Sequence, residues 1–269
     1  MTPQGRLVEI PGTRLYVYTF GDPNASALLY LHGGPGMGCH EFARWQGEAL
    51  GRRLHLVTFD QRGTNQSDPV DEGDLLTEEV LVEDCEALRS ALGVESWFVI
   101  GHSFGGRVAT RYAAKHPERV RGVLFDTPSW NVESTERHRL PVLAEIYEAH
   151  GRSDKAARCR TLARSPDLFA DGYPMDLLGG LQEFGQAWYP YDRSNGALID
   201  DAGIEPRDPQ AGNRAAQRLA NAPAIFEDLL PLLVQLRSWL PTMASPGRSA
   251  RPMQQIGRIL DGSAGRRAE

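Results

Sequence analysis

Short runs of apolar and β-branched residues, bounded by turn-forming residues, recur through the first half of the chain. Such runs predict β-strands. The turn Pro11-Gly12-Thr13 between the first two runs is too short for anything but a hairpin, whereas helix-length segments separate the later ones. The pattern predicts an α/β fold whose sheet starts antiparallel and continues parallel. The six predicted strands are Arg6 to Ile10, Arg14 to Phe20, Ala27 to Leu31, Leu54 to Phe59, Trp97 to Ile100 and Val120 to Phe125.

Two segments between these strands predict crossover helices. In the first, Thr77 to Leu92, a threonine suited to capping precedes apolar residues at helical spacing, and Gly93 ends the pattern. The second, Arg107 to Lys115, carries small alanines and ends before Pro117. Small side chains would let this helix lie close to the sheet.

The character of the sequence changes after the sixth predicted strand. Residues 129–231 show helical patterns broken by Gly and Pro clusters and no run typical of a core strand, which predicts a helical cap insertion. From Arg237 onward the chain carries a net charge of +4, against −10 for the rest. We therefore predict a core at 1–128, a cap at 129–231 and an atypical basic segment at 232–269 in place of the final core strands.

Composition narrows the functional class. A chain of 269 residues with 41% hydrophobic content suits one main domain with an insertion. Its net charge of −6 argues against nucleic acid or an anionic membrane as partner. The first residues lack the pattern of a leader peptide, and no apolar run is long enough to span a membrane, so we expect a cytoplasmic protein. Three widely spaced cysteines fit a reduced compartment and give no metal-ligand spacing.

The strongest chemical motif follows the fifth predicted strand. It reads Gly101-His102-Ser103-Phe104-Gly105-Gly106 and leads into a helix, the strand–turn–helix context that gives G-x-S-x-G its meaning as a nucleophile elbow. A turn this tight leaves no room for side chains two positions before and two positions after the serine, so Gly101 and Gly105 are required. Ser103 is the predicted nucleophile, placed at a helix N-terminus where a developing oxyanion is favoured.

Two further motifs follow the third and fourth predicted strands. His32-Gly33-Gly34-Pro35-Gly36 is a Gly-rich turn that can offer a backbone N–H to the same oxyanion, opposite the N–H of Phe104. Asp60-Gln61-Arg62-Gly63 can brace neighbouring loops through hydrogen bonds and an ion pair, and we assign Asp60 and Arg62 a structural role. Asp60 as a catalytic acid is the less favoured alternative.

In this order and spacing, the three motifs resemble the proline iminopeptidase branch of the α/β hydrolases over residues 1 to about 126. The resemblance implies removal of an N-terminal residue, often proline, by a Ser–Asp–His triad without a cofactor or metal. It also implies an oxyanion hole made by the backbone N–H groups of Gly34 and Phe104, with His32, Gly33, Gly101 and Gly105 in support. The family holds the substrate amine with acids of the cap, for which Glu183 is a candidate.

The base of this triad has no evident counterpart in the sequence. In this fold the acid and then the histidine follow the serine, yet the last histidine is His150. The side chain of His102 should point away from Ser103. Asp126 and Asp261 are candidate acids, and the base is left unassigned.

A frameshifted or divergent terminus would remove the histidine, the strand pattern and the acidic composition together. We hypothesise such a change from about residue 237. If neither other reading frame of the coding DNA yields a strand, an Asp and a downstream His, the frameshift hypothesis is wrong.

Three functions remain open. The first is a serine aminopeptidase with a preference for proline, and the second is an esterase or amidase acting on another small molecule. The third is a hydrolase scaffold without a working triad. The expected partner is a small peptide or other small-molecule substrate, and the oligomeric state stays open.

Overall fold

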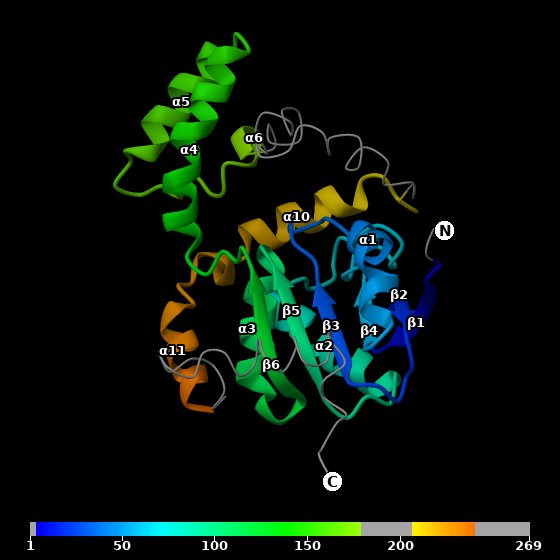
Figure 1. The fold of residues 1–269 in the computed structure, drawn as a ribbon. Coiled ribbons are helices and arrows are strands. Elements are labelled where there is room, and N and C mark those ends of the chain that lie inside the picture. Colours follow the sequence, from blue (N-terminus) through cyan, green and yellow to red (C-terminus); the bar gives the residue numbers. More distant parts are fainter. Residues whose placement is uncertain (1–3, 179–205, 240–269) are drawn as a thin grey trace. The chain divides into compact units, whose positions relative to one another are not determined.

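The computed structural model describes residues 4–178 and 206–239, and its centre is one six-stranded sheet (Figure 1). The strand order is β1-β2-β4-β3-β5-β6. β1 pairs antiparallel with β2, and β2 with β4, while β4, β3, β5 and β6 run parallel. The predicted antiparallel start and parallel continuation are confirmed. The strands are β1 (Arg6–Ile10), β2 (Thr13–Phe20), β3 (Ala27–Leu31), β4 (His55–Phe59), β5 (Trp97–His102) and β6 (Val120–Asp126).

The helices that surround this sheet agree with the sequence pattern in part. Thr77 caps the helix α2 by accepting a hydrogen bond from the N–H of Val80, as its position predicted. The helix α3 begins at Phe104, directly after the elbow and three residues earlier than predicted. The helix α1 was not predicted at all. The helices of the core are α1 (His40–Gly51), α2 (Glu78–Ala91), α3 (Phe104–Lys115), η1 (Pro117–Arg119), α10 (Ala211–Asn221) and α11 (Leu230–Trp239).

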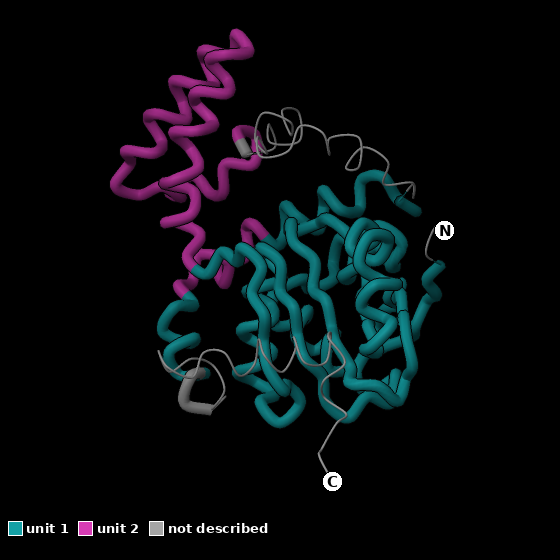
Figure 2. Tube along the Cα trace, in the orientation of Figure 1, with its two compact units in different colours: residues 1–130, 204–219, 229–269 teal, residues 131–203, 220–228 magenta. Residues whose placement is uncertain are grey.

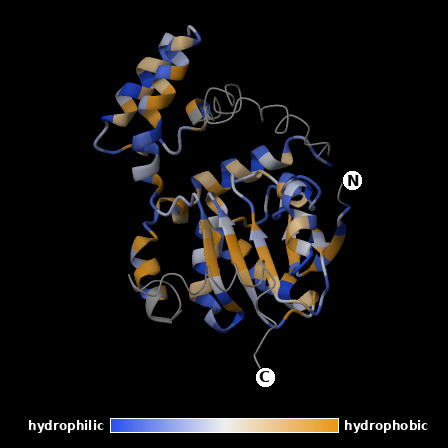
Figure 3. Ribbon diagram, in the orientation of Figure 1, coloured by the Kyte–Doolittle hydropathy of each residue, from blue (hydrophilic) through white to orange (hydrophobic). Residues whose placement is uncertain are grey.

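Helices cover both faces of the sheet, because alternate strand residues point to opposite sides. On β5, Phe98 belongs to the apolar cluster that includes Ala43 of α1. The next residue back, Trp97, instead packs edge-on against Tyr112 of α3. Most of β5 is coloured as hydrophobic (Figure 3). The core strands are therefore buried on both faces, which is typical of a parallel sheet.

A buried ion pair joins α2 to α3. Arg107 Nε donates to Glu78 Oε1 at 2.6 Å, and both side chains are essentially inaccessible to solvent. Arg107 also donates to the carbonyl of Trp130 at 2.8 Å, and Arg111 pairs with the second carboxylate oxygen of Glu78. These contacts hold the helix that follows the elbow against its neighbour.

The chain divides into two compact units (Figure 2). Unit 1 comprises residues 1–130, 204–219 and 229–269, and unit 2 comprises residues 131–203 and 220–228. Unit 2 has its own apolar cluster, centred on Leu143, Tyr147 and Cys159. Its helices are α4 (Val132–Ala149), α5 (Ser153–Ala163), α6 (Met175–Leu178) and η3 (Pro223–Phe226). The predicted domain boundaries stay a prediction, and the basic segment from residue 240 lies outside the described residues.

Within residues 4–178 and 206–239, no helix has the length and apolar character needed to cross a membrane. All three cysteines are free and buried.

Candidate active site

Ser103 occupies a strained turn between β5 and α3. Its backbone angles are φ 50° and ψ −118°, a left-handed conformation that costs a non-glycine residue on the order of 1–3 kcal/mol. The turn is fixed from both sides, because the Ser103 N–H donates to the Asp126 carbonyl and the Gly106 N–H donates to the Ser103 carbonyl, each at 2.9 Å. Strain held in this way is the feature expected of a nucleophile elbow.

The glycines of the elbow are required by close packing. A Cβ on Gly101 would lie 2.7 Å from the Gly106 Cα, and a Cβ on Gly105 would lie 2.2 Å from the Leu31 carbonyl oxygen. Either contact is too short for any side chain. The first turn of α3 therefore rests directly on the backbone at the end of β3.

The Gly-rich loop after β3 lies against the nucleophile. A Cβ on Gly33 would come within 3.0 Å of the Ser103 Cβ. The next residue, Gly34, is exposed with φ 123°. Across from it, Phe104 is the first residue of α3, so its N–H is one of the donors that a helix start leaves without an acceptor in the helix. The loop and the helix start that carry the two predicted oxyanion donors therefore both adjoin Ser103.

His32 holds this loop in place. Its buried ring donates from Nδ1 to the Gly33 carbonyl at 2.8 Å, and Nε2 accepts from the Gln61 N–H at 3.0 Å. The Gln61 side chain returns a hydrogen bond to the His32 carbonyl at 3.0 Å. Burial lowers the pKa of His32 to about 4. With both ring nitrogens engaged, His32 supports the oxyanion loop and has no nitrogen left to accept a proton from Ser103.

Asp60 and Arg62 brace different parts of the core. The buried Asp60 carboxylate accepts from the Cys39 N–H at 2.9 Å and the Gln66 N–H at 3.2 Å, and burial raises its pKa. Arg62 forms a two-point ion pair with Asp84 of α2, with N···O distances of 2.6 and 3.0 Å. The two motif residues therefore do not pair with each other. Each ties a loop to a neighbouring element.

A helix distant in sequence also packs against the Gly-rich loop. The α10 backbone approaches Gly36 so closely that a Cβ on Gly36 would lie 2.2 Å from the Gly212 carbonyl oxygen and 2.8 Å from the Ala216 Cβ. Arg207, just before this helix, pairs with Asp68 at 3.0 Å. The sequence pattern assigned these residues to the cap insertion, but residues 204–219 group with unit 1.

His102, beside the nucleophile, has a carboxylate partner. Its Nδ1 lies 2.9 Å from Asp126 Oδ2. The ring also approaches the Gly-rich loop, since a Cβ on Gly33 would lie 2.9 Å from the His102 Cδ2. The sequence predicted Asp126 only as a candidate acid, without a histidine partner. In the structure its side chain contacts that of His102.

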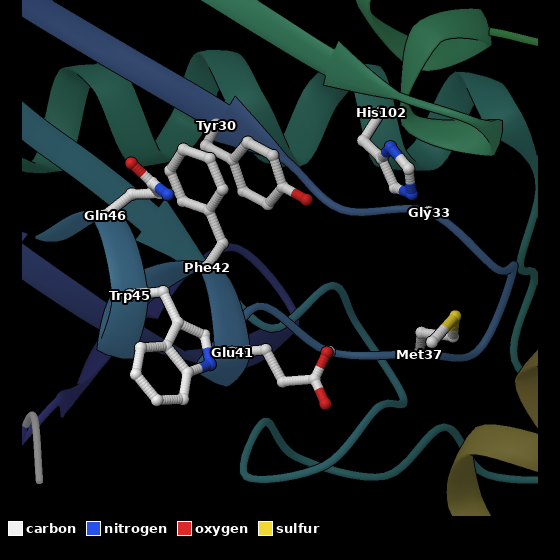
Figure 4. Close-up of a pocket in the computed structure, with 9 residues that line it drawn as sticks. Tyr30, Gly33, Met37, Glu41, Phe42, Trp45, Gln46 and His102 are labelled. Atoms are coloured by element: carbon white, nitrogen blue, oxygen red, sulfur yellow. The ribbon is translucent and has the colours of Figure 1, made fainter. Parts of the chain in front are cut away.

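A small cavity opens beside this pair (Figure 4). It has a volume of about 250 Å³ and lies between Tyr30 of β3, the loop that contains Gly33, and the face of α1 that carries Glu41, Phe42 and Trp45. His102 lines its far end. The cavity could not be predicted without α1, whose Ala43 and Gly47 are one helical turn apart in the sequence.

His138 and His150 belong to unit 2, where each Nδ1 contacts the backbone carbonyl four residues earlier, at 2.7 and 2.8 Å. Glu183 and Asp261 lie outside the described residues.

Comparison with known proteins supports the fold. The family model described as alpha/beta hydrolase fold matches residues 26–148. A proline iminopeptidase-related protein from Thermus thermophilus superposes with a TM-score of 0.57 over 97% of this chain and 99% of its own, at 23% identity. The chain has the α/β-hydrolase fold.

The curated relatives that match this chain are named proline iminopeptidases. That of Xylella fastidiosa (strain 9a5c) is 38% identical over 125 residues, which cover 45% of this chain and 39% of the relative. That of Xanthomonas citri is 40% identical over 129 residues, covering 45% of this chain and 40% of the relative. The resemblance drawn from the three motifs is confirmed. The matched part spans about two fifths of the length of these relatives.

Proposed function

We propose that this protein is a serine hydrolase that removes an N-terminal residue, proline above all, from small peptides through an acyl-enzyme on Ser103. The observation that carries the proposal is the strained Ser103 elbow packed against Gly33 of the Gly-rich loop. The names of the curated relatives support the substrate class.

In the proposed reaction, Ser103 Oγ attacks the carbonyl carbon of the first residue and forms a C–O bond. The carbonyl electrons move to oxygen, and the N–H groups of Gly34 and Phe104 stabilise that oxyanion. When the intermediate collapses, the C–N bond breaks and the leaving amine takes a proton. Water then hydrolyses the ester, which releases the first residue and restores the Ser103 hydroxyl.

A serine hydroxyl needs a base to accept its proton. Among the residues that the structure describes, His102 is the histidine beside the nucleophile that also has a carboxylate partner. Because Nδ1 faces Asp126, Nε2 is the ring nitrogen that would take the proton, and this role requires the His102 ring to approach Ser103 Oγ, against the orientation expected from the sequence. We therefore propose the His102–Asp126 pair as the proton acceptor.

Two measurements on the wild type and Ser103→Ala test the proposal. One is release of a chromogenic amine from its proline amide, and the other is covalent labelling by a phosphonate that reacts with activated serines. We expect turnover and labelling of the wild type, with turnover reduced at least about 10³-fold and no labelling in the variant. Equal rates in the two proteins would contradict the proposal.

Two other outcomes would identify the alternative functions. Turnover of small esters without turnover of the proline amide would favour an esterase or amidase, because the cap rather than the core motifs sets specificity in this fold. An unlabelled Ser103, with no turnover of either substrate, would identify a scaffold without an activated nucleophile.

A further inference from the structure

The strand β6 forms one edge of the sheet (Figure 1). Within residues 4–178 and 206–239, it pairs with β5 alone. An edge strand presents a row of backbone N–H and C=O groups with which another strand can pair. At seven residues, β6 is longer than the average strand of about five or six. The edge is therefore long enough to take a further strand.

The side chains of β6 do not protect this edge. Its middle, Gly122 to Phe125, carries no charge and is half-exposed along its whole length. At the other edge of the sheet, the exposed positions of β1 include Arg6 and Glu9. Charged side chains on an edge strand discourage pairing with other strands. The edge at β1 is thus protected, whereas the edge at β6 has the apolar sequence of an inner strand.

The charges of β6 stand at its two ends. Arg121, near the start, and Asp126, at the end, are both exposed. A second β6 in the antiparallel direction would bring each arginine near an aspartate, whereas a parallel one would bring like charges together. Arg121 lies over the Phe98 ring at 4.7 Å and donates to Ser26 at 3.3 Å, and its guanidinium has further N–H groups for a second acceptor. The strand is therefore complementary in charge to an antiparallel copy of itself.

The alternation of side chains limits the register of such a pair. Residues directly opposite each other must lie on the same face of the sheet. One register that meets this condition sets Leu124 opposite Leu124 of the second copy, Val123 opposite Phe125, and Gly122 opposite Asp126. Because Gly122 has no side chain, it leaves room for the neighbouring Arg121 to reach the carboxylate. The apolar middle of each strand then packs against that of the other.

The helix α11 extends this surface, since it lies at the β6 end of the sheet (Figure 1). The Leu229 N–H, just before α11, donates to the Trp130 carbonyl at 3.1 Å, and the Trp130 ring packs edge-on against Phe125 of β6. Leu230 and Val234, one helical turn apart, are 46% and 68% exposed. A strand pair alone buries little area, so apolar side chains on α11 would enlarge the interface towards the size of a stable dimer.

A second copy fits this edge better than the other strands that could cover it. The sequence of residues 240–269 contains three prolines and no run typical of a strand. Pairing of β6 with the β1 edge of another copy would be opposed by the charges of β1 and would continue into open-ended chains. Pairing of β6 with β6 is the same on both copies, so it closes as a dimer.

We infer that two copies of this chain associate through antiparallel pairing of their β6 strands about a two-fold axis, which joins their sheets into one. This association is independent of the proposed hydrolase activity. It also places Arg121 of the second copy beside Asp126, whose carboxylate contacts His102. The second copy would thus help to fix the carboxylate that orients this ring.

Sedimentation velocity of the full chain over a range of concentrations tests the inference. We expect a dimer for the wild type and at least about tenfold weaker dimerisation for Arg121→Glu, because two attractive contacts become repulsive. Leu124→Lys, which sets two ammonium groups opposite each other, should give a monomer. Arg6→Glu and Leu7→Lys make the same changes at exposed positions of β1 and should leave the dimer intact. Circular dichroism checks that each variant is folded.

Two further variants test the pairing itself. Arg121→Glu combined with Asp126→Arg exchanges the charges and should restore the dimer. Leu124→Cys should form a disulfide between copies under mild oxidation, since the three native cysteines are buried and opposite residues of paired strands come close enough. Leu7→Cys is the control and should not crosslink. A folded wild type that stays monomeric, assemblies larger than a dimer, or a dimer insensitive to both Arg121→Glu and Leu124→Lys would overturn the inference.

Discussion

Asp126 contacts the two consecutive elbow residues at once: its carboxylate lies 2.9 Å from His102 Nδ1, and its carbonyl accepts the Ser103 N–H at 2.9 Å. If His102 accepts the proton of Ser103, His102→Gln should lower kcat about 10²- to 10⁴-fold. Asp126→Asn keeps the backbone contact and should lower kcat about 10²-fold, because the ring loses its orientation. Steady-state kinetics on the proline amide measure both effects.

His138→Gln is the matched control for that prediction. His138 is an exposed histidine on α4 whose Nδ1 contacts the Ser134 carbonyl, so its replacement should leave kcat unchanged. Full activity of His102→Gln would contradict the proposed role of His102 as the base.

Gly105→Ala should destabilise the protein by at least about 2 kcal/mol. Its Cβ would meet two backbone oxygens, those of Leu31 and His32, at 2.2 and 2.6 Å, and backbone cannot move aside as a flexible side chain can. Urea unfolding followed by circular dichroism measures the change. Gly73→Ala, where the added Cβ meets nothing within 4 Å, should be neutral, and equal effects of the two substitutions would contradict this account of the elbow.

Arg107→Met should lower the free energy of unfolding by about 3 kcal/mol, because it leaves part of the Glu78 carboxylate and the Trp130 carbonyl without their buried donor. Lys115 lies on α3 like Arg107, and Lys115→Met removes its exposed pair with Glu83 of α2, which should cost less than about 1 kcal/mol. Chemical denaturation distinguishes the two. If both variants lost a similar amount of unfolding free energy, the buried ion pair would contribute no more to stability than the exposed one.

His32 should make the protein less stable in mild acid. Its pKa in the folded state is about 4, below the ordinary value of 6.5, so the unfolded chain binds the proton more readily between these values. Stability from this group is therefore present above about pH 6.5, falls as the pH drops towards 4, and levels off below that. The full difference amounts to about 3 kcal/mol.

The variant His32→Asn tests that pH dependence. It should be less stable than the wild type at pH 7, because it loses the ring contacts with Gly33 and Gln61, and the gap should narrow as the pH approaches 4. Other titrating groups are common to both proteins and cancel in the difference. A gap that stays constant from pH 7 to pH 4 would contradict the assignment.

Much of the fold could be predicted from the sequence, because strands buried on both faces read as continuous apolar runs. β3 and β4 are buried along their whole length and were predicted almost to the residue. The helix α1 was missed because only His40, Ala43 and Gly47 are buried in it, so its pattern of large apolar residues is weak. Because α1 was not predicted, the residues of α1 that line the cavity were not predicted either.

The candidate site was predictable only where local backbone chemistry dictates the residue. The turn at Ser103 and the close approach at Gly33 both require glycines, and these glycines can be recognised in the sequence. The pairing of His102 with Asp126 requires no particular residue pattern near either position, because it depends on β5 and β6 lying side by side in register. Contacts between residues far apart in the chain need the folded sheet before they can be seen.

The packing of Gly212 on Gly36 has a consequence for how the site forms during synthesis. The elbow and the Gly-rich loop leave the ribosome early, but the helix that holds the loop follows only after most of unit 2 has been made. Until then, the loop lacks the surface against which it rests. The nascent chain therefore acquires its complete oxyanion loop late, and a pause in translation before α10 would leave Ser103 beside an unsupported loop.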